Sequence, residues 1–250
     1  MLAALALHER RRHGPPAPGA WRYAAAAGAF FAADLILWHH AIGDVGAGLA
    51  TVLANLQVVF VAVAAWTLLG ERPTARVVAA VPLVFIGAVL ISGVVGPDAF
   101  GSDPALGAVY GVLTAVAYTG FILVLREGSR DLRRPAGPLF AATLVATFVA
   151  AGAGALLGDL ALTPSWPAHG WLVTLALTSQ VLGWLLIAVA LPRLPAALTS
   201  VVLTVQPVGS VLLGIVLLGE EPAPLQLAGV AVIVAGIVVA TRRGPRPALV

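Results

Sequence analysis

An aspartate stands in the middle of a long apolar stretch close to the start of the chain. Asp34 is the one acid or base clearly inside such a stretch, and Phe31 and Trp38 share its helical face at spacings of three and four residues. A charge in an apolar interior is costly and usually faces a cavity or a partner. We interpret Asp34 as a proton or cation site walled by aromatic rings. The alternative is an acid that is protonated, or hydrogen-bonded to a neighbouring helix, for a structural reason.

Other apolar stretches also carry polar side chains near their centres. They are Asn55 and Gln57, then Tyr110, Thr114 and Tyr118, then Gln180 and Trp184, and finally Thr204 and Gln206. Such groups suit a polar organic substrate, whereas the alternatives are hydrogen bonds between helices and aromatic packing. The residues expected to bind or couple a substrate are Asp34, Trp38, Asn55, Thr114, Tyr118, Gln180, Trp184 and Gln206. Asn55 and Gln57 face different sides of a helix, so we expect one member of that pair to line a cavity.

Pro207 follows Gln206 directly in the sequence. Proline has no backbone N–H, so it frees the carbonyl of Leu203 in the middle of its stretch. We interpret this feature as a kink rather than as a ligand contact.

Catalytic and metal chemistry find little support in the sequence. The chain has no cysteine, which removes thiolate ligands and cysteine nucleophiles. His39 and His40 are adjacent, but the other three histidines lie far apart, and a metal site needs a cluster. No nucleophile–base pair and no phosphate-binding loop is evident. We therefore expect no catalytic residue, no metal and no cofactor.

The composition identifies the elements that must position these groups. Of 250 residues, 60% are apolar and 10% are charged, and the mean hydropathy is +1.00. Soluble domains average about 45–50% apolar and about 25% charged residues, so a soluble enzyme and a disordered chain are excluded. The pI of 10.2 reflects 14 arginines against 11 acids and does not indicate a nucleic-acid partner. The class that remains is a multi-pass membrane protein.

Eight stretches are long and apolar enough to cross a bilayer as helices. They cover residues 23–42, 48–69, 77–95, 105–125, 139–157, 171–191, 197–218 and 225–241, with short joints rich in glycine and proline between them. We therefore predict an all-α membrane protein of about eight transmembrane helices.

The arginines predict the orientation of these spans. When the joints are assigned alternately to two sides, all 14 arginines fall on one side, and the other side holds six acids, among them Asp44 and Glu220. The positive-inside rule places the arginine side in the cytoplasm, so both termini are expected there.

The chain also matches itself at an offset of 149 residues. Gln57 meets Gln206, residues 68–71 meet residues 217–220, and Gly87 meets Gly236. The paired spans lie five apart, and because five is odd they cross in opposite directions, which makes an inverted-topology repeat.

Equal units of five helices would make the chain the remnant of a ten-helix 5+5 fold, with roughly 45 residues absent from the front. A misassigned start and a natural truncation are both left open. We expect a truncated first repeat at residues 1–96, a five-helix second repeat at 104–243 and a cytoplasmic tail at 244–250.

The second half carries an ordered series of short motifs. They are residues 191–198, Gln206-Pro207-Val208, residues 217–222, residues 226–229 and Gly236. In order and spacing they resemble the second EamA domain of the drug/metabolite transporter superfamily. The first half resembles the same domain, with Val58 where the second half has Pro207. The resemblance implies ten helices with both termini inside and the transport, often the export, of small metabolites. It brings no site residues with it.

These observations favour a secondary transporter, an exporter rather than an importer, for small polar or amphipathic metabolites in the inner membrane of a bacterial cell. Its partners would be a small-molecule substrate and the lipid bilayer, and not nucleic acid. Coupling to protons and a homodimer stay open. Two alternatives remain: a truncated membrane protein that does not transport, and a membrane-embedded enzyme.

Overall fold

The structure is a computed structural model, and all of its regular structure within the described part of the chain is helical. The described residues are 2–16, 19–70, 72–93, 95–96, 98–128, 134, 136–158, 163–183 and 196–241, with the backbone alone for 69, 180–183 and 196–205. The helices are α1 (Leu2–His13), α2 (Ala20–Val45), α3 (Ala47–Ala54), α4 (Gln57–Leu69), α5 (Ala75–Ile91), α6 (Pro104–Gly128), α7 (Ala136–Leu157), α8 (Ala168–Leu175), the π-helix η1 (Ala176–Gly183), α10 (Ala196–Leu218) and α11 (Pro224–Thr241).

Each of the eight predicted spans overlaps at least one of these helices. Among the described residues, five segments are long and apolar enough to cross a membrane: Ala20–Val45, Ala47–Leu68, Pro104–Gly128, Ala136–Leu157 and Pro224–Thr241. Two apolar helices are shorter, Ala75–Ile91 and Gln206–Leu218. The span predicted at 171–191 corresponds to α8 and η1 as far as Gly183, beyond which it lies outside the described residues. The prediction of an all-helical, multi-pass membrane fold is confirmed.

The structure differs from the predicted spans in three places. The span at 48–69 divides into α3 and α4 at Asn55 and Leu56. The span at 77–95 ends as a helix at Ile91, because Gly93 takes a left-handed conformation with φ +73°. Ahead of the first predicted span, residues 2–13 form a further helix, α1, which runs through three consecutive arginines to His13.

Local signals explain where two of the helices begin. Asp103 stands before α6, and its side-chain oxygen accepts a hydrogen bond from the Leu106 N–H at 3.0 Å. Pro104 and Pro224 occupy the first positions of α6 and α11, where the missing N–H is not needed. Proline and a capping acid therefore set these two starts.

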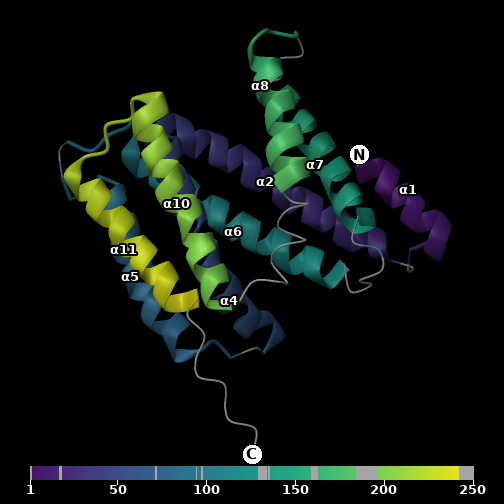
Figure 1. The fold of residues 1–250 in the computed structure, drawn as a ribbon, viewed down its shortest axis with the longest axis horizontal. Helices are drawn as coiled ribbons and strands as arrows, with labels where there is room; N and C mark the ends of the chain where they lie inside the picture. Colours follow the sequence, from purple (N-terminus) through teal and green to yellow (C-terminus); the bar gives the residue numbers. More distant parts are fainter. Residues whose placement is uncertain are drawn as a thin grey trace, which may run out of the picture.

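The helices pack in neighbouring pairs (Figure 1), and their buried side chains form a main core and a smaller cluster. α2 lies against α6 and α7, α5 lies beside α11, and α3 contacts α10. The fully buried side chains Leu49, Leu53, Leu56, Ile91 and Ile233 come from α3, α5 and α11 and the turn before α4. By contrast, α8 and the outer face of α10 expose large apolar side chains, as expected for surfaces that face lipid.

The packing of α5 on α11 has the internal symmetry that the sequence repeat predicts. A side chain at Gly87 would meet Gly229 and Ile233, and one at Gly236 would meet Ala80 and Val84. Adding 149 to 80, 84 and 87 gives 229, 233 and 236, so each helix makes the same contacts on its repeat mate. In addition, α4 and α10 both end at a left-handed glycine, Gly70 with φ +72° and Gly219 with φ +66°.

Hydrogen bonds between the connecting segments agree with the predicted sides. On the predicted outer side, Ser102 donates to the Gly43 carbonyl and Phe100 N donates to Gln226. On the predicted inner side, Ala136 N donates to Glu9 at 3.0 Å and Arg134 donates to the Gly14 carbonyl at 2.7 Å. Each bond joins segments that the arginine count assigns to one side of the membrane.

Candidate substrate-binding and coupling site

The antiparallel packing of α2 on α6 brings the two predicted polar stripes together. Phe31 stacks on Phe121 with ring centroids 4.8 Å apart, and His40 stacks on Tyr110 at 5.2 Å. In an antiparallel pair with this register, Asp34 comes opposite Tyr118 and Trp38 comes opposite Thr114. The helices approach closely because Gly107, Gly111 and Gly120 leave room for side chains of α2 and α3.

Asp34 is the central group of this site. Its side chain is 8% exposed, and no hydrogen bond or ion pair joins it to any other residue that the structure describes. The register of α2 on α6, fixed by the Phe31–Phe121 and His40–Tyr110 ring contacts, places Tyr118 opposite it. A carboxylate in such surroundings is stabilised only by a proton, a cation or a hydrogen-bond donor, so Asp34 is suited to binding one of these.

Thr114 is the second unpartnered group. It is 1% exposed, and its hydroxyl oxygen has no hydrogen-bond partner among the residues described. Other threonines behave differently: Thr119 on the same helix donates to the Ala115 carbonyl at 2.8 Å. A buried hydroxyl without a partner costs free energy unless something else binds it, so Thr114 is available to a ligand.

The break between α3 and α4 is the third feature of the site. Asn55 N bonds back to the Thr51 and Val52 carbonyls, and Val58 N donates to the Asn55 carbonyl at 3.2 Å instead of to Ala54. The turn is therefore tighter than an α-helix, and the Ala54 carbonyl loses its usual donor. Such tight turns within a helix often mark hinges.

The break has a counterpart in the second repeat. The repeat mates of Ala54 and Val58 are Leu203 and Pro207, and Pro207 lies inside α10. Because proline has no N–H, the Leu203 carbonyl loses the same bond by different means. The two repeats therefore free equivalent carbonyls in mid-span.

The structure places the other predicted residues as follows. Trp38 is partly buried, packs on the main core and contacts His39 edge-on at 5.5 Å. Asn55 is 8% exposed, and its amide donates to the Thr51 carbonyl at 2.8 Å, so it stabilises the break. Gln206 is exposed on α10 and is not part of the α2–α6 site.

Two predicted residues are not tested by the geometry. Trp184 lies outside the described residues, and so does the side chain of Gln180. Their predicted contribution to a site stays a prediction.

The two adjacent histidines do not belong to a metal-binding cluster in the described part of the chain. No group of three or more His, Asp, Glu or Cys side chains that could hold a metal ion occurs among those residues. His39 Nδ1 bonds with the Leu35 carbonyl of its own helix at 2.7 Å, and His40 stacks on Tyr110. His39 therefore bonds within its own helix, and His40 packs on α6.

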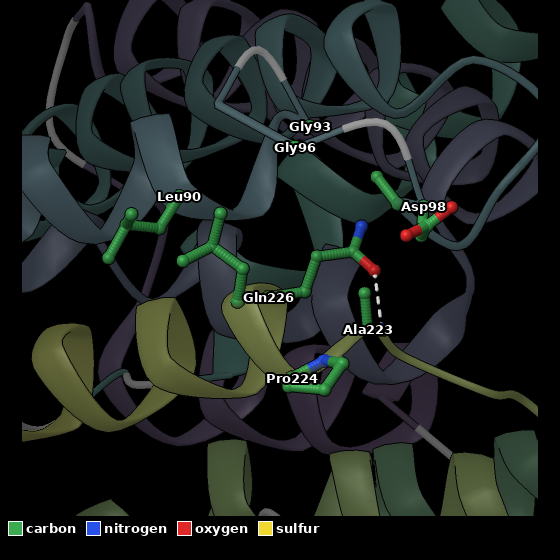
Figure 2. Close-up of a pocket in the computed structure, with 9 residues that line it drawn as sticks. Leu90, Gly93, Gly96, Asp98, Ala223, Pro224 and Gln226 are labelled. Carbon is green, nitrogen blue, oxygen red and sulfur yellow. Dashed lines mark hydrogen bonds between the residues drawn. The ribbon is translucent and has the colours of Figure 1, made fainter.

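A small pocket lies elsewhere, at the ends of α5 and α11 (Figure 2). Gln226 lines it together with Leu90, Asp98 and Pro224, and Figure 2 shows the bond from Ala223 N to its amide oxygen. The same oxygen accepts from Phe100 N, and the amide nitrogen donates to the Ile91 and Phe100 carbonyls at 3.1 Å each. Because these bonds occupy both the oxygen and the nitrogen of the amide, we interpret Gln226 as a structural residue that holds α5, α11 and the segment around Phe100 together.

Two functional positions are absent from the residues that the sequence predicts. The first is Phe121, which stacks on Phe31 close to Asp34. Its spacing of three residues from Tyr118 and seven from Thr114 places it on their helical face, and this signal could have indicated it from the sequence. In the sequence Glu220 is only a charge at a helix end, but in the structure it is 7% exposed. No local pattern could have shown that burial.

The comparison with protein families decides the class. A model of the EamA-like transporter family matches residues 1–93 and 105–242, which is nearly the whole chain. The chain belongs to the EamA-like transporter family. No curated protein and no solved structure matches it. This EamA-type protein is therefore a membrane transporter of the drug/metabolite transporter type, as the sequence motifs predicted.

Proposed function

We propose that this EamA-type transporter exports small polar or amphipathic metabolites across the inner membrane of a bacterial cell, with Asp34 as the residue that couples or binds the cargo. The observation that carries the proposal is the Asp34 carboxylate, 8% exposed between α2 and α6 and without a hydrogen-bond or ion-pair partner among the described residues. Intramembrane acids in transporters commonly serve as proton relays or substrate sites.

The neighbours of Asp34 suit this role. The Tyr118 hydroxyl opposite the acid and the Thr114 hydroxyl one turn away along α6 supply hydrogen-bonding groups, and Phe31 and Phe121 supply apolar walls. An amphipathic metabolite needs both kinds of contact, and a cationic group can also lie against an aromatic ring. Protonation of Asp34 would alternate with substrate binding if the two compete for one carboxylate.

The paired breaks in α3–α4 and α10 support transport over a static role. Transporters with inverted repeats bind their cargo near the membrane centre, typically where helices are discontinuous. The tight turn at Asn55 divides α3 from α4, and Pro207 removes a backbone donor within the continuous helix α10, so each repeat has a disrupted helical hydrogen bond at mid-span. We infer transport rather than catalysis, because Asp34 has no nucleophile–base partner among the described residues.

A panel of candidate substrates tests the proposal. Everted membrane vesicles that contain the protein are acidified inside by respiration, and a pH-sensitive dye reports the gradient. Amino acids, amines and nucleosides are then added one at a time. A proton-coupled exporter takes its substrate into these vesicles and releases protons, so at least one compound should restore the dye signal.

Asp34→Asn is the decisive variant. It mimics the protonated acid and keeps the size of the side chain, so we expect normal folding and loss of the pH-driven response by at least about tenfold, as for loss of an essential intramembrane acid. Asp98→Asn removes a charge from an exposed site and is the matched control, for which we expect no change. An unchanged response in Asp34→Asn would remove Asp34 from the mechanism.

A further inference from the structure

Glu220 lies just beyond α10 and is buried, whereas its neighbour Glu221 is exposed. The left-handed Gly219 ends α10, and Glu220 N donates to the Gly214 carbonyl at 3.1 Å. This turn points the Glu220 side chain back along the helix towards the first repeat.

The carboxylate of Glu220 caps a helix of the other repeat. Its Oε1 accepts a hydrogen bond from Ala47 N at 2.5 Å, and its Oε2 accepts one from Gly48 N at 3.1 Å. These N–H groups open α3 and have no partner within the helix, and that end of the helix carries partial positive charge. A single side chain therefore ties α10 to α3 by two charge-assisted bonds.

Three glycines make room for this carboxylate. A side chain at Gly46 would come within 2.9 Å of its Cδ, one at Gly48 within 2.9 Å of Oε2, and one at Gly214 would overlap Oε2. The absence of side chains at all three positions is what allows the close approach.

The repeat mate of Glu220 does not have the same glycines around it in the sequence. The offset of 149 residues pairs Glu220 with Glu71, which lies outside the described residues. The same offset pairs the three glycines with Pro195, Ala197 and Ala65. The sequence thus has no glycine at the three positions that would correspond to those around Glu220, although α10 starts at Ala196 as α3 starts at Ala47.

We propose that Glu220 is a latch that holds the extracellular ends of α3 and α10 together and keeps that face of the transporter closed at rest. The inference rests on the proposed function, because a latch matters only if the repeats separate during transport. α3 and α10 belong to different repeats, so opening a path between them to the outside must break both bonds to Glu220. The three glycines that make room for a carboxylate accompany Glu220, on the outer side, and do not accompany Glu71, on the inner side. The outer face is therefore the one that is held closed at rest.

A cysteine reporter in the central site tests the latch. Thr114→Cys adds the only thiol of the chain at a position where the hydroxyl has no partner among the described residues. The rate at which a membrane-impermeant thiol reagent, added outside, modifies this cysteine measures opening to the outside. In this background Glu220→Gln should raise the rate roughly five- to tenfold, since the amide can accept only one of the two bonds. Glu221→Gln, which removes the adjacent exposed charge, should not.

A second variant separates the latch from loss of charge. Gly214→Ala keeps Glu220 and favours the helix, but its methyl group occupies the place of Oε2. It should raise the labelling rate as Glu220→Gln does, whereas Glu71→Gln should not raise it. Equal labelling in Glu220→Gln and Glu221→Gln, with the reporter reactive in both, would overturn the latch alone. A reporter that reacts in no variant would overturn the latch and also the central site of the proposed function.

Discussion

At the scale of single residues, buried polar groups in this transporter fall into two kinds. Gln226 and Glu220 have their hydrogen bonds made within the protein, and they join segments near the ends of helices. Asp34 and Thr114 lie at mid-span and make no hydrogen bond to the described residues. A satisfied polar group stabilises the fold, whereas an unsatisfied one is retained only if a ligand or proton uses it. This contrast is the reason for assigning function to the second kind.

The first kind leads to a prediction for stability. Gln226→Leu would leave the Phe100 N–H and the Ile91 carbonyl without partners, so we expect a loss of about 2–4 kcal/mol in the free energy of unfolding. Gln206→Leu makes the same change at an exposed position of α10 and should cost almost nothing. Thermal unfolding in detergent, followed by size-exclusion chromatography, compares the two. Similar midpoints of thermal unfolding for both variants would contradict the structural role of Gln226.

At the scale of elements, the α5–α11 pair shows how the repeats meet. Helices in a membrane associate through close packing and small side chains, because lipid supplies no hydrophobic drive between them. Gly87 and Gly236 occupy equivalent places in this contact. The break between α3 and α4 and the proline of α10 lie in the other pair of repeat mates. In that pair, α3 and α10 are in contact. One pair of helices is thus closely packed, and the other carries a tight turn in one member and a proline in the other.

Alanine substitutions should rank these contacts. At Gly87 a methyl group would overlap Ile233, so we expect destabilisation of about 1–3 kcal/mol. At Gly236 the nearest atom would be 3.2 Å away, so the cost should be smaller. Gly209→Ala in α10 meets nothing within 4 Å and should stabilise the protein by about 0.5–1 kcal/mol. Denaturation in mixed micelles would measure the order, and the same midpoint for Gly87→Ala and Gly209→Ala would refute it.

At the scale of the whole molecule, orientation decides what each contact does. The bonds of Glu220, Ser102 and Phe100 lie on the predicted outer side, and those of Glu9 and Arg134 lie on the predicted inner side. The latch therefore closes the outer face only if the arginine side is cytoplasmic.

Single cysteines test the orientation directly, since the chain has none of its own. Ser102→Cys is exposed and should react with an impermeant thiol reagent in intact cells. Ser129→Cys, in the arginine-rich joint outside the described residues, should react only after permeabilisation. The reverse pattern would overturn both the orientation and the side assigned to the latch.

Sequence alone determined the helical, multi-pass class of the fold, and it predicted the spans, the side of each joint and the polar stripes of α2 and α6. These properties are local: length and hydropathy define a span, arginine content defines a side, and helical periodicity places Phe31, Asp34 and Trp38 on one face. The family motifs are also local patterns at fixed spacing, and for that reason the residues by themselves were enough to indicate the EamA-like family.

Only the tertiary structure decided which polar groups meet. In a membrane protein, apolar side chains cover the faces that touch lipid as well as those that touch protein, so hydropathy does not distinguish them. The sequence therefore could not show that Gln206 is exposed, that Asn55 bonds to its own helix, or that Tyr118 comes opposite Asp34. Glu220 depends even more on packing, because its partners on α3 lie more than 170 residues away along the chain. Such a contact exists only once the two repeats have packed against each other.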